Sequence, residues 1–135
     1  MNNIALILIL FFIPSFAQAK DPQLNYMMEC QGCHGADGSG GLETIPAMNN
    51  QLAKFLAIPG GREFLVKVPG VAQSSLSDAE TTAVLNWMLN RFGPSEIAQS
   101  YPPYTVEEVS RLRKTPLTEV QQKRTMLLKM LNRSS

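Results

Sequence analysis

The hydrophobic pattern of the chain begins with one continuous apolar run. Ile4 to Phe12 carries no charge, but it is shorter than the stretch of about 20 residues that spans a bilayer. Ala17-Gln18-Ala19 has the small-x-small pattern of a signal-peptide cleavage site. Residues 1–19 are therefore predicted to be a secretion signal, which is removed on export to an oxidising compartment. A retained membrane anchor is the alternative, because Met1-Asn2-Asn3 supplies no Lys or Arg.

The pattern that follows predicts short elements separated by glycine and proline. Asp21-Pro22 places an N-cap and a first-turn proline at the start of a helix that runs into Cys30. Residues 32–41 are too rich in glycine for regular structure, and glycine lets the backbone approach a flat ligand closely. A short helix is expected over residues 52–58 and a second short apolar segment over 62–68, each closed by a Pro-Gly pair.

The clearest helix of the chain begins at a capping box. In Ser77-Asp78-Ala79-Glu80, the serine and the glutamate satisfy each other's free backbone donors, and Gly93-Pro94 ends the helix. Apolar residues recur on one face at helical spacing, namely Ala79, Ala83, Val84, Trp87, Met88 and Phe92. No stretch alternates long enough to predict a strand, so the predicted fold class is all-α.

The C-terminal part, residues 94–135, reads as a helical extension. Tyr101-Pro102-Pro103-Tyr104 is a stiff linker. Thr105-x-x-Glu108 and Thr118-x-x-Gln121 are capping-box patterns that predict a short helix and then a longer one.

Composition narrows the possible chemistry. The chain has 135 residues, enough for one domain with an extension, and a net charge of +1, which gives no reason to expect nucleic acid binding. It contains two cysteines and one histidine, so any metal chemistry uses very few of the usual ligands.

These three residues form one motif, Cys30-Gln31-Gly32-Cys33-His34, the signature of c-type haem attachment. The two thiols add to the two vinyl groups of one porphyrin, and a two-residue spacer lets both sulfur atoms reach them. His34 then lies beneath the iron and supplies an axial nitrogen. The motif predicts one covalent haem c with its iron, held by Cys30, Cys33 and His34.

Three other readings of the two cysteines fit less well. A thioredoxin-like redox site belongs in a βαβ context, which the pattern lacks. A structural zinc site needs four ligands, and the chain has no second pair. A plain disulfide is compatible with export, but it gives no reason for the histidine.

Around this motif the chain resembles the class I cytochromes c, from about Lys20 to Phe92. The resemblance rests on the helix that enters the motif and on three segments: Gly35-Ala36-Asp37-Gly38-x-Gly40, Ile45-Pro46 and Leu76-Ser77-Asp78-Ala79-Glu80. It implies three to five short helices around one covalent haem, with the first and last helices crossing. Residues 20–93 would form the haem domain, followed by the extension. Pro46 resembles the family's proline whose carbonyl accepts a hydrogen bond from the axial histidine, although it is equally well read as a loop breaker.

The sequence departs from this family at the sixth iron ligand. Class I cytochromes usually supply a methionine from the loop before the last helix, but residues 68–75 contain none. Met48 and Met88 are the candidates for an unusual sixth ligand, with Lys67 behind them, and an open or water-occupied position is equally compatible. The remaining methionines, Met27, Met28, Met126 and Met130, read as apolar packing residues.

The predicted function is electron transfer in the periplasm by a carrier that is not itself an enzyme, with a redox partner protein. Membrane contact is expected only if residues 1–19 are retained. One alternative is an open distal site that binds a small ligand; another is a subunit docked on a periplasmic dehydrogenase or oxidase. Arg62, Lys67 and Arg91 could steer an acidic partner to the haem edge or simply solvate the surface.

The extension carries an apolar stripe, Val120, Leu127 and Leu131, that must be covered. The haem domain can cover it, with Tyr101 and Tyr104 as anchors. A partner protein can also cover it, helped by Lys123, Arg124, Lys129 and Arg133. We expect an ordered extension that is dispensable for haem attachment and needed for partner contact.

Overall fold

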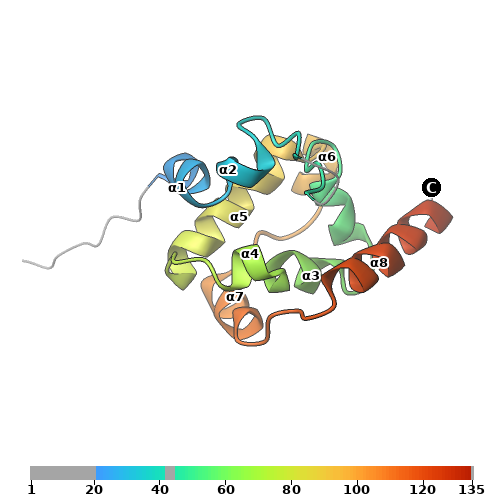
Figure 1. Cartoon of the computed structure of the whole chain (residues 1–135). Coiled ribbons are helices and arrows are strands. Elements are labelled where there is room, and N and C mark those ends of the chain that lie inside the picture. Colours follow the sequence, from blue (N-terminus) through green and yellow to red (C-terminus); the bar gives the residue numbers. More distant parts are fainter. Residues whose placement is uncertain (1–20, 42–44, 135) are drawn as a thin grey trace, which may run out of the picture.

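The computed structural model describes residues 21–41 and 45–134, and these are helical apart from loops and one isolated bridge between Gly41 and Ile45 (Figure 1). The predicted all-α class is confirmed. The elements are α1 (Pro22–Glu29), α2 (Gln31–His34), the 3-10 helix η1 (Leu52–Ala57), α3 (Gly61–Lys67), α4 (Pro69–Ala72), α5 (Asp78–Phe92), α6 (Ser95–Gln99), α7 (Val106–Arg113) and α8 (Val120–Ser134). The predicted secretion signal lies outside the described residues.

The first helix packs across α5, as the resemblance predicted. Asp21 caps α1 by accepting a hydrogen bond from the backbone N–H of Gln23. Tyr26 is buried at the crossing, and its ring centroid lies 5.2 Å from that of Trp87 and 5.2 Å from that of Phe92. This aromatic cluster holds α1, and with it the chain that leads into Cys30, against the longest helix of the haem region.

Helix α5 begins at the predicted capping box, with Ser77 and Glu80 bonded reciprocally. Its buried face is rotated from the predicted one. Ala79 is exposed and Ala83 is only half-buried, whereas the residues that the helix buries are Thr81, Thr82, Val84, Leu85, Met88, Leu89 and Phe92. Leucines and threonines that the apolar pattern passed over face the core because α5 is covered from two sides, by α1 and by α7.

Three short helices, α2, α4 and α6, were not predicted. The expectation that residues 32–41 lack regular structure is wrong for residues 32–34, which belong to α2. α4 is a single turn in which Pro69 occupies the first helical position, where its missing N–H is not needed. α6 follows Pro94 directly. α4 lies in the segment that the sequence pattern assigned to a loop, and residues 95–99 of α6 received no predicted element, since one turn is too short to show a hydrophobic period.

The C-terminal extension packs on the haem region. Tyr104, Val109, Leu112 and Leu127 are almost completely buried in the same core as the side chains of α1 and α5. α7 contacts α3 and α5, and α8 contacts α3 and η1. The stripe of α8 is therefore covered by the chain itself, the first of the two predicted options. Tyr104 anchors the linker, because its O–H donates to the carbonyl of Arg62 at 2.8 Å.

Arg62 belongs to this contact and is not free to steer a partner, which corrects one sequence expectation. Its guanidinium donates to both carboxylate oxygens of Glu108, at 2.6 and 2.7 Å, and to the carbonyls of Pro102 and Pro103. It also lies 4.1 Å from the centroid of the Tyr104 ring. Glu108 thus pairs with Arg62 and does not return to cap α7, where only the Thr105 half of the predicted box forms.

Glu108→Gln is expected to reduce stability by about 1 kcal/mol at pH 7, as for a partly exposed charged pair. The hydrogen bond from Arg62 lowers the pKa of Glu108 below its ordinary value. A depressed carboxyl pKa stabilises the fold above the unfolded pKa of about 4.3, and this stabilisation is lost as pH falls through the folded pKa. Urea unfolding of both proteins between pH 7 and pH 3 measures the effect. A difference that stays constant with pH would contradict it.

Candidate functional site

The haem-attachment motif occupies one helical turn. α1 ends at Glu29, and Cys30 is the N-cap of α2. The backbone N–H groups of Cys33 and His34 both donate to the Cys30 carbonyl, at 3.2 and 3.0 Å. Both cysteines are free thiols, so the plain disulfide is not formed. This turn brings the two thiols and the imidazole together on a short, hydrogen-bonded segment.

The thiols and the imidazole lie in different surroundings. Cys33 is exposed, whereas Cys30 is partly buried. Burial, with a smaller contribution from the Glu29 charge, raises the pKa of Cys30 to about 11, so it remains a protonated thiol at neutral pH. Burial lowers the pKa of His34. The histidine is therefore neutral at pH 7, which is the form that coordinates a metal.

Pro46 lies where the resemblance places an acceptor for the axial histidine. The Pro46 carbonyl acts as a hydrogen-bond acceptor toward the His34 ring, and this raises the pKa of His34. Burial lowers the same pKa and has the larger effect. Nδ1 of His34 is nevertheless buried without a hydrogen bond of standard geometry. The Pro46 carbonyl is thus near the ring, but it forms no standard hydrogen bond with Nδ1. Such a bond fixes the ring and increases its basicity as a ligand.

Two glycines hold the loop after His34 close to its neighbours. Gly38 has a φ of 73°, and a Cβ there would lie 2.8 Å from the Phe92 ring. Gly40 has a φ of 81°, and a Cβ would lie 2.6 Å from the Ile45 carbonyl oxygen. Only glycine accepts both the backbone conformation and the contact. The segment around Pro46 is therefore packed directly against the loop that follows the histidine.

The methionines separate into buried and exposed groups. Met48 and Met88 are 7% and 4% exposed. Met48 lies two residues after Pro46, and its N–H donates to the Gly38 carbonyl at 2.8 Å, which ties this segment to the loop after His34. Met27 and Met28 are 50% and 66% exposed. The expectation that they pack as core is wrong, because Tyr26 and Asn25 occupy the face of α1 that meets α5.

A contact that the sequence did not indicate joins the loop before α5 to the motif. The Ser75 O–H donates to the Glu29 carboxylate at 2.7 Å, one residue before Cys30. In the view of Figure 1, α2 lies between the glycine-rich loop on one side and α4 on the other. The glycine-rich loop thus follows the motif directly, and the loop before α5 reaches the residue that precedes Cys30. No local pattern could have revealed this pairing, since the two residues lie 46 positions apart.

The residues present fit a covalent haem c. Two unpaired thiols stand at the required spacing, a neutral imidazole follows them, and one nitrogen of that imidazole is buried without a bond. A shallow groove of about 440 Å³ lies elsewhere, between the start of α5 and α7, and none of its lining residues belongs to the motif. The donor set, and not the groove, therefore locates the cofactor site.

An all-α fold in which the first and last helices of the haem region cross beside a Cys-x-x-Cys-His turn defines a c-type cytochrome. Comparison with known proteins identifies the group more closely. Cytochrome c-552 of Thermus thermophilus is 33% identical over 111 residues, which cover 69% of this chain and 85% of the relative. A second cytochrome c-552 from the same species is also 33% identical, with 75% of its length covered. No family model matches. The chain belongs to the class I c-type cytochromes and is a haem-based electron carrier.

Proposed function

We propose that the protein carries single electrons between periplasmic redox proteins through one haem c, bound covalently by Cys30 and Cys33 and coordinated by His34. The observation that supports this most directly is the single helical turn that presents all three side chains. The apolar run and Ala17-Gln18-Ala19 support export. When bound, the haem supplies an iron that alternates between two oxidation states.

Each surrounding residue has a defined role in this proposal. Cys30 and Cys33 tether the porphyrin, so that it is not lost outside the cell. His34 supplies the proximal nitrogen, and the Pro46 carbonyl orients its ring. Met48 and Met88 contribute buried apolar volume that excludes water, which reduces the solvent reorganisation that accompanies a change of charge.

The exposed face of α1 is the proposed contact surface for the redox partner. Leu24, Met27 and Met28 are 45%, 50% and 66% exposed. They occupy one side of the helix, at spacings of three and four residues, and this helix leads into the thioether cysteines. An apolar contact beside the tethered edge of the porphyrin shortens the path for electrons and needs no fixed ion pairs.

Spectroscopy and electrochemistry of the full chain, expressed with cytochrome c maturation machinery, test the proposed function. We expect the haem to survive denaturation and extraction with acidified acetone, and we expect one reversible one-electron wave. A pigment that is extracted by acidified acetone, or a protein that matures without pigment, would overturn the proposal.

A second candidate function, binding of a small ligand at the iron, is favoured by the loop composition. Residues 68–76 flank the motif but contain no Met, His, Cys or Lys. Met48 lies two residues after Pro46, and its N–H donates to the Gly38 carbonyl in the loop that follows His34. If the Pro46 carbonyl orients His34 as the resemblance implies, Met48 would lie on the same side of a bound haem as His34 and would not supply the sixth ligand.

Met48→Leu and Met88→Leu are therefore expected to keep the parental visible spectrum. Leucine preserves most of the buried volume but cannot coordinate iron. The Met–iron charge-transfer band of the oxidised protein is the measurement. If the parent shows this band and one variant loses it, that methionine is the sixth ligand and the second candidate function fails.

A further inference from the structure

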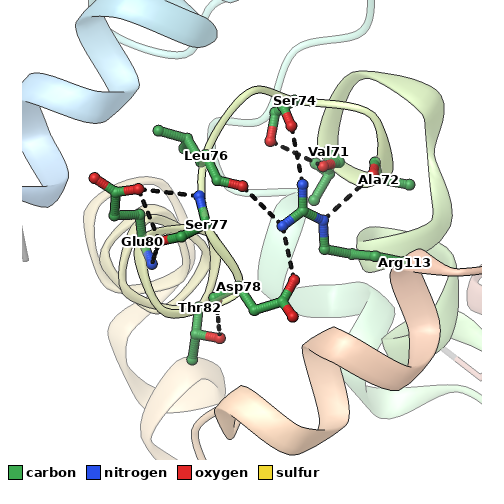
Figure 2. A network of polar contacts seen from close by, with 9 residues as sticks. All are labelled: Val71, Ala72, Ser74, Leu76, Ser77, Asp78, Glu80, Thr82 and Arg113. Carbon is green, nitrogen blue, oxygen red and sulfur yellow. Dashed lines mark hydrogen bonds and ion pairs between the residues drawn. The ribbon is translucent and has the colours of Figure 1, made fainter.

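Arg113 joins the C-terminal extension to the loop before α5. It is the last residue of α7, and its side chain is only 12% exposed. Its Nη1 donates to the Leu76 carbonyl and to the Asp78 carboxylate, each at 2.9 Å. Its Nη2 donates to the Ser74 carbonyl at 2.9 Å, and its Nε to that of Ala72 at 3.3 Å. Figure 2 shows the loop curving around the guanidinium.

The geometry of this contact requires arginine. Three of the four acceptors are main-chain carbonyls at alternating positions, 72, 74 and 76, and the fourth is the carboxylate of the first residue of α5. A planar guanidinium offers several donors in fixed directions, so it can hold three separate points of one loop at once. A lysine ammonium is a flexible point charge and cannot reproduce this pattern.

The loop that Arg113 holds is the one that reaches the haem-attachment motif. Ser75 lies between two of the held carbonyls and donates to Glu29, which precedes Cys30. Class I cytochromes usually supply the sixth iron ligand from the loop before the last helix. By that resemblance this loop is the one expected to face a bound haem opposite His34, and it contains no side chain that binds iron strongly.

We propose that Arg113 is a positioning residue that keeps this loop closed over an iron site open to small neutral diatomic ligands. The inference rests on the proposed haem attachment. With all four contacts made, the main chain of residues 72–76 is fixed at both ends and in the middle. A groove beside Arg113 is lined by Ala72 and Leu76 at the two ends of the loop and by Ser110 and Lys114, so the loop borders open space once the guanidinium is removed.

Carbon monoxide binding to the reduced full-length protein tests this proposal. In the parent, binding is expected to be slow, because it waits for a minor open state of the loop. Arg113→Gln removes the guanidinium that holds the loop. The association rate of carbon monoxide should rise about tenfold, because an open state of the loop that is populated at about 10% or less in the parent becomes the major state. Arg113→Lys should behave like Arg113→Gln, since it keeps the charge but not the geometry.

Two control variants separate positioning from general effects. Arg62→Gln removes another guanidinium, whose hydrogen-bond partners are Glu108, Pro102 and Pro103 and do not include this loop, so it should lower stability without changing the carbon monoxide rate. Arg111→Gln removes an exposed cation from the same helix, so it controls for charge. If Arg113→Gln does not mature, Asp78→Asn weakens one contact only and should give a smaller increase.

The outcomes distinguish this proposal from the proposed function. A parent with covalent haem whose Arg113 and Asp78 variants bind carbon monoxide at the parental rate overturns the role of Arg113 alone. A reduced parent that binds no carbon monoxide overturns the open site. A rate increase in Arg62→Gln equal to that in Arg113→Gln would show that lost stability, and not loop position, controls access. Absence of covalent haem from the parent would overturn both proposals.

Discussion

Replacing both Cys30 and Cys33 with serine should abolish covalent haem attachment. A serine hydroxyl does not add to a porphyrin vinyl group under the conditions in which a thiol does, and the chain has no other cysteine. His34 alone would hold the iron by one coordinate bond, which denaturation breaks. The protein should therefore show no haem staining after denaturing electrophoresis, whereas the parent should stain strongly.

The single variants Cys30→Ser and Cys33→Ser provide the matched controls. Each keeps one thiol, so each should retain some covalent haem with a shifted absorption band from the remaining vinyl group. Haem that stays bound to the double variant after denaturation would contradict attachment at this motif. Loss of haem from the double variant only, with a folded apoprotein by circular dichroism, would separate attachment from folding.

Truncation after Gly93 should prevent the haem region from folding. It removes Tyr104, Val109, Leu112 and Leu127 from the core. Burial of one such side chain contributes about 1.5–3 kcal/mol, and a whole domain is stable by only about 5–15 kcal/mol. The loss is comparable with the total. The burial of these four side chains in the shared core therefore argues against the sequence expectation that the extension is dispensable for haem attachment.

Yield of haem-loaded protein and thermal unfolding measure this effect. Truncation after Lys114 is the informative comparison, because it keeps α7 with Glu108 and Arg113 and removes only α8. Removal of α8 alone should leave a protein that matures with reduced stability, since among the residues of α8 whose burial is described only Leu127 is fully buried. A protein ending at Gly93 that holds haem with parental stability would show that the contacts of the extension contribute little.

Local chemistry allowed the sequence to determine the attachment motif and most helix boundaries. The spacing of Cys30, Cys33 and His34 is set by the porphyrin itself, so five consecutive residues contain the whole signal. The start of α1 at Asp21 and the start of α5 at Ser77 each depend on residues within three positions. For the same reason, the fold class followed from periodicity without any knowledge of long-range contacts.

The sequence also predicted the family, but not how the extension is used. The roles of Arg62 and Arg113 depend on acceptors 35 to 46 positions away, and charge patterns along a sequence do not show such pairings. The exposure of Met27 and Met28 depends on which side of α1 meets α5. Only the tertiary structure decided these points, because a side chain's burial and hydrogen-bond partners are set by elements that meet after the chain has folded.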